Sequence, residues 1–347
     1  MAKRLLIVTQ KVDESDNNLG FFARWIEEFA KHVPLVTVIC LEKGSYHLPG
    51  NVQVFSLGKE ELKINDRRLR ILPKLQYTLQ FLRYIVSERK NYDEVFIHMN
   101  PEYVLLGGVL WRLFRKKVGF WYTHQSERFL QSALLFVDHV FTPSKESFPI
   151  QTRKARIVGH GVDTELFAPR KQNLPPHVPL ILSDTRLSPS KHVEQTLEIS
   201  KELGKLGVAH TIQIIGAAIT TGDRAYEKRL REHVQKERLP VSFIGGVSFA
   251  RVPDYYGKAD IFINQANVGA LNKTVLQAMS MNLPVVTSNE SYRGILPDTA
   301  IVQEDPRVFA EKIQEVLSQS SAVSYRERIL RDHSLQALIP KILNYYA

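Results

Sequence analysis

The sequence predicts an α/β protein with two domains, each built on a parallel β-sheet. Short β-branched apolar runs alternate with longer amphipathic segments along most of the chain, which is typical of βαβ units. The alternation is interrupted at 167–179, where several prolines occur, and then restarts. With 347 residues, the chain also exceeds the length at which a single hydrophobic core stops growing.

The first half contains seven apolar runs of strand length. We expect strands at 4–9, 35–41, 52–56, 94–98, 118–122, 139–142 and 155–158. Helices are expected at 20–32 and 69–90, because apolar residues recur there every three to four positions.

The second half repeats this organisation. Strands are expected at 180–183, 210–215, 241–244, 261–264, 285–287 and 300–302, and helices at 193–206, 223–237, 274–281 and 306–319. The last segment, 324–346, is also helical in pattern. We therefore expect an N-terminal domain at 1–168, a second domain at 169–323 and a C-terminal helix at 324–347.

The composition is that of an ordinary globular protein, with 44% hydrophobic and 24% charged residues. No run approaches the roughly 18 apolar residues that span a bilayer, and the N-terminus shows no signal peptide. The single cysteine, Cys40, ends an apolar run and has no intrachain partner, which favours a buried thiol in a reducing compartment. We expect a cytoplasmic protein.

The net charge of +10 is concentrated in two clusters. They contain Lys59, Lys63, Arg67, Arg68, Arg70 and Lys74, and then Arg112, Arg115, Lys116 and Lys117. Such clusters attract the phosphates of lipids or soluble anions, although a solvated helix face is the alternative. A peripheral contact with the anionic inner face of a membrane stays open, whereas nucleic acid is not expected because no nucleic-acid-binding motif accompanies the charge.

Two loops of the chain resemble those of a known enzyme family. Residues 158–163 read Val-Gly-His-Gly-Val-Asp and are followed by Phe167 and Pro169, while 184–191 read Asp-Thr-Arg-Leu-Ser-Pro-Ser-Lys. They resemble the "NGVD…F.P" and "GRL…K" segments of the retaining glycosyltransferases of family 4. The resemblance covers nearly the whole chain. It implies the GT-B fold, in which two Rossmann-like domains face each other across a cleft and the C-terminal helix crosses back to the first domain.

The second of these loops carries two cations, Arg186 and Lys191. The resemblance implies that they bind the diphosphate of a nucleotide-sugar. The residues themselves support this reading, because a strand ending at 183 delivers both to a strand-to-helix loop, where cations and helix N-terminal amides suit a diphosphate. The alternative is a pair of surface charges on an ordinary loop.

Several glycines match family positions. Gly216 follows a predicted strand, and Gly245 and Gly246 end the segment 241–246, which resembles a family stretch near the nucleobase. Gly20 opens a helix where the family has a glycine-rich loop, so its amide is expected near the phosphate or the acceptor. Tight turns without any ligand are the alternative for Gly245 and Gly246.

The segment 269–277 aligns with the family's E-x7-E motif, but Gly269 and Gln277 replace the two glutamates. In the family, the first glutamate approaches the donor sugar and the second binds the ribose. Glutamine can still hydrogen-bond ribose hydroxyls, whereas glycine supplies no carboxylate. We expect further donor contacts at Leu271, Asn272, Lys273 and Thr274, although Lys273 could instead point to water.

His124 follows the predicted strand at 118–122 and resembles a family histidine near the donor sugar. A structural histidine is the alternative. Polar residues at the ends of this strand and of the strand at 94–98 are also expected to face the cleft, namely His98, Asn100, Glu102, Thr123 and Gln125.

The predicted function is therefore a retaining glycosyl transfer from a UDP- or GDP-linked sugar to a glycan, glycolipid or small-molecule acceptor, as in polysaccharide biosynthesis. His124, Arg186, Lys191 and Lys273 are the predicted catalytic residues. The chain has no Asp-x-Asp triplet and no His/Cys cluster, so neither a metal nor another cofactor is expected. A degenerate nucleotide-sugar-binding scaffold is the alternative, because both motif glutamates are missing. A sugar-nucleotide epimerase is weaker, since it needs several acid-base carboxylates.

Overall fold

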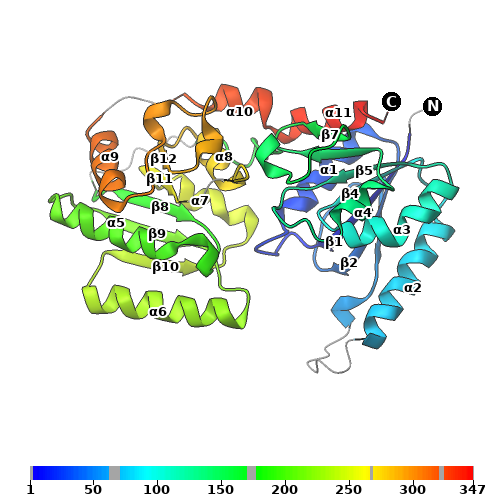
Figure 1. Cartoon of the computed structure of the whole chain (residues 1–347), viewed down its shortest axis with the longest axis horizontal. Helices are drawn as coiled ribbons and strands as arrows, with labels where there is room; N and C mark the ends of the chain where they lie inside the picture. Colours follow the sequence, from blue (N-terminus) through cyan, green and yellow to red (C-terminus); the bar gives the residue numbers. More distant parts are fainter. Residues whose placement is uncertain (1–2, 62–70, 170–176, 266–268, 320–323, 347) are drawn as a thin grey trace. The chain divides into compact units, whose positions relative to one another are not determined.

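A computed structural model describes residues 3–61, 71–169, 177–265, 269–319 and 324–346. The chain forms two compact units, the first made of Met1–Gly161 and Leu335–Ala347 and the second of Val162–Ser334. Each unit is built on a parallel sheet with helices on its faces (Figure 1). The predicted α/β fold class is thereby confirmed.

The first unit contains a seven-stranded sheet in the order β3-β2-β1-β4-β5-β6-β7. Its strands are β1 Leu5–Val12, β2 Val36–Lys43, β3 Val52–Ser56, β4 Glu94–His98, β5 Lys117–Trp121, β6 His139–Thr142 and β7 Ala155–Ile157. All of the pairings are parallel. The strand order reverses between β1 and β4, which is where sheets of this type bind ligands.

Helices cover both faces of this sheet. One face packs against α1 (Phe21–His32) and α11 (Leu335–Asn344), and the other against α2 (Ile71–Ser87), α3 (Pro101–Leu113) and α4 (Leu130–Leu134). The helix predicted at 69–90 corresponds to α2, whereas α3 and α4 were not predicted. Four residues of the first basic cluster, Lys63, Arg67, Arg68 and Arg70, lie outside the described residues.

The second unit contains a five-stranded parallel sheet in the order β10-β9-β8-β11-β12. The strands are β8 Leu180–Asp184, β9 Thr211–Ile215, β10 Val241–Gly245, β11 Ile261–Asn264 and β12 Val285–Thr287. The helices are α5 Val193–Lys205, α6 Thr221–Glu237, α7 Val252–Tyr256, α8 Lys273–Ser280, α9 Pro306–Ser318 and α10 Arg326–Asp332. Here the strand order reverses between β8 and β11.

Two of the predicted elements differ from the observed ones. The strand predicted at 300–302 is absent, because Asp298–Ala300 form a 3₁₀ helix and Ile301 makes only an isolated bridge with Thr287. The single helix predicted at 324–346 is two helices, α10 and α11, separated at 333–334. No helix among the described residues is long and apolar enough to cross a membrane.

The unit boundaries also differ from the predicted ones. The segment 162–168 and helix α10 belong to the second unit, whereas α11 belongs to the first. One reason is that the Val162 amide donates a hydrogen bond of 2.7 Å to the His333 carbonyl, which joins the start and the end of the second unit. The chain therefore changes units at 161–162 and 334–335, not at 168–169 and 323–324.

Candidate functional site

The carboxyl edge of the second unit's sheet, where β8 and β11 end, is the expected position of a ligand. Asn264 ends β11 and is buried. Its side-chain carbonyl accepts hydrogen bonds from Asn272 Nδ2 (3.3 Å) and Thr287 Oγ1 (3.2 Å). These bonds connect the loop before α8 to the ends of two neighbouring strands.

Asp184 ends β8, and Tyr256 of α7 donates a hydrogen bond of 2.8 Å to its Oδ2. The same tyrosine hydroxyl lies 3.4 Å from the Thr274 carbonyl in the first turn of α8. Burial raises the pKa of Asp184 to about 6, although the bond from Tyr256 opposes this shift. The sequence analysis did not assign these two residues to the site. Asp184 could have been predicted from the sequence, because it is a polar residue at the end of an apolar strand.

The loop after β8 holds Arg186 and Lys191 close to each other. Arg186 is exposed and Lys191 is partly buried, in a short 3₁₀ turn, Pro189–Lys191. Burial lowers the pKa of Lys191, and the positive charge of Arg186 lowers it further. Neither cation forms an ion pair with an acidic side chain among the described residues. Two like charges held close together repel each other, so an anion between them would be favourable.

Gly216 follows β9, the strand next to β8, and Gly245 is the last residue of β10, on the other side of β9. Gly216 has φ +136°, and a Cβ atom at this position would lie 1.9 Å from the Thr185 carbonyl oxygen. Its amide donates to the Gly245 carbonyl (3.0 Å), and Gly245 itself has φ +86°. Glycine therefore allows the loops after β8, β9 and β10 to approach one another. Gly246 is exposed beside them.

The loop 269–272 is fixed by three side chains of the segment 289–292. These hydrogen bonds run from Ser291 Oγ to the Gly269 carbonyl, from Asn289 Nδ2 to the Ala270 carbonyl (3.2 Å) and from Tyr292 Oη to the Asn272 carbonyl (2.7 Å). Asn289 and Tyr292 are fully buried, and Leu271 packs into the core of the unit. Because Tyr256 also contacts Thr274, the first turn of α8 is held from two sides.

Helix α8 presents its N-terminus at the same edge. Its first residue is Lys273, and the preceding Asn272 makes no side-chain hydrogen bond that caps the helix. Burial lowers the pKa of Lys273 to about 7. Gln277 lies one turn further, on the same face as Lys273, and is buried. The helix therefore combines a cation, backbone amides and a side-chain amide.

The polar residues predicted in the first unit have different environments. His124 is exposed, and its Nδ1 accepts a hydrogen bond of 3.0 Å from the Ser126 amide. His98 is buried, lies 3.2 Å from Thr9 Oγ1 and stacks on the Phe22 ring at a centroid distance of 4.0 Å. The packing of His98 is that of a core residue, whereas His124 is accessible to a ligand.

The other polar residues of this group lie at the same strand ends. Asn100 precedes the first residue of α3, and Glu102 is exposed in the first turn of that helix. Thr123 is partly buried, and Gln125 donates a hydrogen bond of 2.6 Å to the Glu146 carbonyl. Of these side chains, Gln125 is therefore already bonded to a neighbouring loop.

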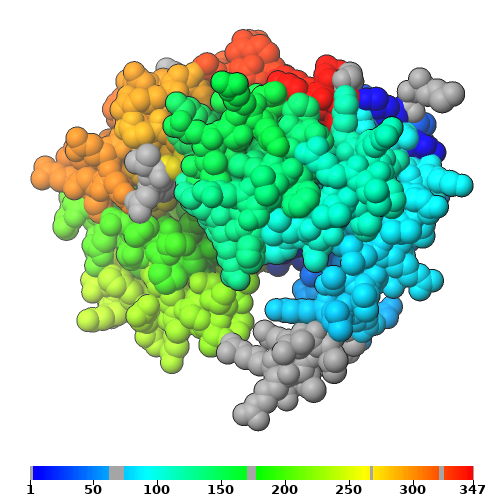
Figure 2. Space-filling model, turned by 45° about the vertical axis from the view of Figure 1, so that its right-hand side comes forward, coloured from blue at the N-terminus to red at the C-terminus, as the bar shows by residue number. Residues whose placement is uncertain are grey.

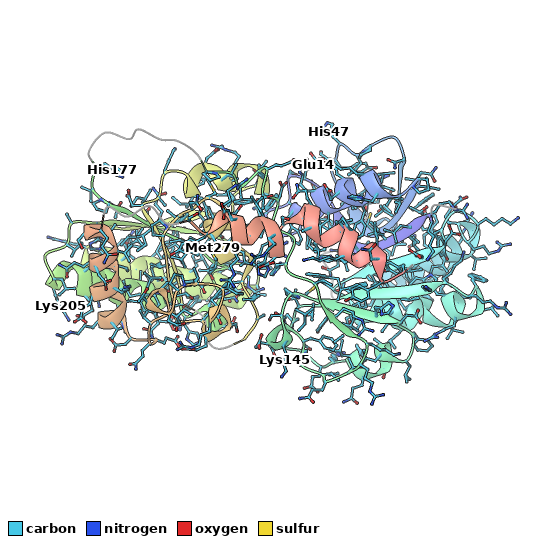
Figure 3. The ribbon with its side chains drawn as sticks, turned by 90° about the horizontal axis from the view of Figure 1, so that it is seen from above. Glu14, His47, Lys145, His177, Lys205 and Met279 are labelled. Atoms are coloured by element: carbon cyan, nitrogen blue, oxygen red, sulfur yellow. The ribbon has the colours of Figure 1, made fainter. Side chains whose placement is uncertain are left out.

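Gly20 is required by its own loop. Its amide donates to the Asp16 carbonyl (3.1 Å), and a Cβ atom would lie 2.5 Å from that oxygen. The loop is also held by Lys11, which forms ion pairs with Asp13, Asp16 and Glu42. A further bond joins the His47 amide to Glu14 Oε1 at 2.6 Å, and Figure 3 shows these two residues side by side. The Gly20 amide is thus used within the chain.

The structure brings together the predicted residues of the second unit, from Arg186 to Gln277, at one edge of one sheet. Among the described residues, no three His, Cys, Asp or Glu side chains form a group that could hold a metal ion. The edge is lined instead by cations, amides and glycines, which suit a phosphate-containing ligand.

Comparison with known proteins agrees with this geometry. Residues 165–331 match the family model of the glycosyl transferases group 1, and all the predicted residues from Arg186 to Gln277 lie in that range. A sulfoquinovosyl transferase of Arabidopsis thaliana, SQD2, is 30% identical over 160 residues, which are 43% of this chain. The match spans 28% of the length of that relative. The second unit is thus similar to the group 1 glycosyl transferases.

Solved structures resemble the whole chain. HepE of Anabaena in complex with UDP and glucose has a TM-score of 0.76 at 15% identity, over 99% of both chains. Sucrose-phosphate synthase from Thermosynechococcus elongatus has a TM-score of 0.79 at 15% identity, over 99% of this chain and 98% of that one. The fold is therefore that of the GT-B glycosyltransferases. Together with the family match, it supports the prediction of a glycosyltransferase.

Proposed function

We propose that the chain transfers a sugar from a nucleoside-diphosphate-sugar to an acceptor, with retention of the anomeric configuration. The observation that carries the proposal is the pair of Arg186 and Lys191 in the loop after β8, neither of which forms an ion pair with an acidic side chain among the described residues. Both lie in the segment that matches the group 1 glycosyl transferases. The HepE structures contain UDP or UDP-glucose, which favours a UDP-linked donor over a GDP-linked one.

In this proposal, the chemistry depends on stabilising the leaving group. As the bond between the anomeric carbon and the diphosphate breaks, negative charge develops on the departing phosphate oxygens. Arg186 and Lys191 bind these oxygens, and Lys273 with the N-terminal amides of α8 adds positive potential. The acceptor hydroxyl then attacks the oxocarbenium-like carbon on the face that the phosphate leaves, and its proton passes to an oxygen of the departing diphosphate, so the configuration is retained.

The remaining residues bind the donor. Gln277 hydrogen-bonds the ribose, and the glycines at 216, 245 and 246 allow the backbone to approach the base. His124 contacts hydroxyl groups of the sugar. No additional cofactor or metal is part of the proposal. The acceptor is a glycan, a glycolipid or a small molecule, and the chain acts in the cytoplasm, in part at the inner face of the membrane.

The test is the release of nucleoside diphosphate from a panel of UDP- and GDP-sugars with candidate acceptors. We expect Arg186→Ala to lower turnover roughly 10²–10³-fold, the usual effect of removing a group that stabilises developing charge. The matched control is Arg224→Ala, which removes an exposed arginine from α6. Turnover that Arg186→Ala leaves unchanged would reject the proposed role of the cation pair.

Gly269 favours a second candidate, a scaffold that binds nucleotide-sugars without transferring the sugar. No carboxylate is available at this position, where the resembling family has a glutamate. The double variant Gly269→Glu/Gln277→Glu distinguishes the two functions. Nucleotide binding without turnover, both in the natural chain and in this variant, would establish the scaffold and rule out the transferase.

A further inference from the structure

Helix α2 exposes an apolar stripe on the outside of the first unit. Leu75, Leu79 and Val86 are 56%, 59% and 40% exposed, and their spacing places them on one side of the helix. The opposite side carries Phe81 and Ile85, which are buried in the core. Helix α2 therefore packs on the sheet with one apolar face and presents a second one to solvent.

Helix α3 repeats this arrangement next to α2. Leu106, Val109 and Leu113 are 39%, 63% and 71% exposed, while Val104 and Trp111 are buried. The two helices lie side by side on the same face of the sheet (Figure 1), and Figure 2 shows both, in cyan, on the side of the molecule turned forward. We call the six exposed residues of α2 and α3 the apolar helix surface. Exposed apolar side chains gathered on two neighbouring helices are typical of a protein or membrane interaction site.

The charges around the apolar helix surface are mostly positive. Helix α2 contains no aspartate or glutamate, and Lys74 and Arg83 are exposed on it. Arg115 is exposed just after α3, whose only acidic residue is Glu102. Lys74, Arg83 and Arg115 form no ion pair with another described residue. The surface therefore offers leucines together with uncompensated cations.

The last two lysines of the second basic cluster have a different role. Lys116 Nζ donates to the Arg89 carbonyl (2.9 Å), and Lys117 Nζ donates to the Tyr346 carbonyl (2.7 Å). These two side chains bond the chain itself. Of the four cations in this cluster, Arg112 and Arg115 therefore remain at the surface. Arg112 donates a hydrogen bond to the Leu135 carbonyl (3.1 Å).

We propose that the apolar helix surface docks the chain on a membrane that contains anionic lipids. The leucines and valines enter the boundary between headgroups and acyl chains, while Lys74, Arg83 and Arg115 meet the lipid phosphates. The charges argue against a second copy of this chain as the occupant, because cations would face cations and α2 supplies no acid to pair with them. The proposal goes beyond sugar transfer and can be tested without it.

The test is co-sedimentation of the full chain with vesicles of phosphatidylcholine alone and of phosphatidylcholine mixed equally with phosphatidylglycerol. We expect binding to the mixed vesicles only, weakening as salt is added. Leu79→Gln/Val109→Gln should weaken it about tenfold or more, because two apolar side chains no longer enter the membrane. Lys74→Gln/Arg83→Gln should weaken it about fivefold for each charge removed.

Matched control variants change exposed residues of the second unit. Ile219→Gln/Leu330→Gln replaces apolar residues that are 51% and 41% exposed, and Arg229→Gln/Lys236→Gln removes two exposed cations from α6. Both should bind the mixed vesicles like the natural chain. Circular dichroism and nucleoside diphosphate release from a soluble donor and acceptor verify that every variant is folded, so a docking failure is distinguishable from a failure of transfer.

Three results would overturn the proposal. The first is no binding of the natural chain to mixed vesicles, and the second is an equal loss in the control variants. The third is a dimer, detected by light scattering without lipid, that Leu79→Gln/Val109→Gln dissociates. This last result would identify a second copy as the occupant of the surface.

Discussion

Lys273 is the residue whose charge depends most directly on the ligand. Burial lowers its pKa to about 7, so most molecules carry a neutral amine at about pH 8. A bound diphosphate would favour the ammonium form and raise that pKa again. Binding is then coupled to proton uptake, and the affinity falls as the pH rises above the pKa of the free protein.

We therefore predict that UDP binding at about pH 8 takes up a fraction of a proton. Calorimetry in two buffers with different ionisation enthalpies measures this fraction. Lys273→Met should bind UDP more weakly and take up less of a proton. A binding enthalpy of the natural chain that is the same in both buffers would show that Lys273 does not sense the phosphates.

Gly216 is the residue where the site tolerates no side chain. In Gly216→Ala, the methyl group would collide with the Thr185 carbonyl, and φ +136° is unfavourable for alanine. We expect a loss of roughly 1–3 kcal/mol in the free energy of unfolding and weaker nucleotide binding, measured by denaturant titration and calorimetry. Gly204→Ala is the control, because that helical position has free space, and it should leave stability equal or higher.

For individual residues, the sequence predicted which residue types occur in the site better than it predicted their contacts. Arg186 and Lys191 could be predicted, because both cations lie in a loop after a recognisable strand. The bond between Asp184 and Tyr256 could not, because it joins residues that are 72 positions apart in the chain. The steric reason for Gly216 likewise depends on a carbonyl of a different strand.

Among the elements, the loop before α8 is held largely by one short segment, 289–292. Tyr292 is fully buried, and its hydroxyl satisfies the Asn272 carbonyl at 2.7 Å. Without that hydroxyl, a carbonyl at the start of α8 would be left without its donor, which typically costs about 1–3 kcal/mol. The segment 289–292 thus supports the loop 269–272 and the start of α8.

We predict that Tyr292→Phe lowers the free energy of unfolding by about 1–3 kcal/mol and weakens nucleotide binding, because the loop 269–272 loses one of its three fixed points. Urea denaturation and calorimetry measure the two effects. Tyr255→Phe, in α7, is the control, since no hydrogen bond of its hydroxyl occurs in the described structure. Equal effects of the two substitutions would contradict a positioning role for Tyr292.

Strands were predicted correctly where a buried segment also pairs with neighbouring strands. The strand predicted at 94–98 corresponds to β4, whose five residues are all buried inside a parallel sheet. The run at 300–302 is also buried in part, but only Ile301 bridges to Thr287, so apolar character there reflects packing and not pairing. Helix α3 was missed because Gly107 and Gly108 lower helix propensity. Glycine occurs there because a Cβ atom at Gly107 would lie 2.4 Å from the Trp111 ring.

On the scale of the whole molecule, the first unit is completed by the end of the chain. Residues Leu338, Ile339 and Ile342 of α11 are buried in the same core as α1. Tyr346 is fully buried, and its hydroxyl donates to the Val95 carbonyl at 2.7 Å. The second unit, by contrast, is one continuous segment, Val162–Ser334. A sequence pattern cannot reveal this division, because it depends on contacts between the two ends of the chain.

We predict that removing residues 335–347 destabilises the first unit and leaves the second folded. Deleting α11 exposes the apolar core that it covers, whereas all the strands of the second unit remain. Hydrogen exchange followed by mass spectrometry should show lost protection in β1 and β4 and unchanged protection in β8 and β11. Full protection of β1 in the shortened chain would show that α11 is dispensable.

The central claim of the account is that Arg186 and Lys191 bind a diphosphate. Calorimetric titration of the full chain with UDP, UMP and uridine measures this most directly. We predict the order UDP, UMP, uridine from tightest to weakest, and in Arg186→Ala and Lys191→Ala an affinity for UDP reduced about tenfold or more, with uridine binding unchanged. Equal affinity for UDP and uridine, or UDP binding that neither substitution weakens, would contradict the claim.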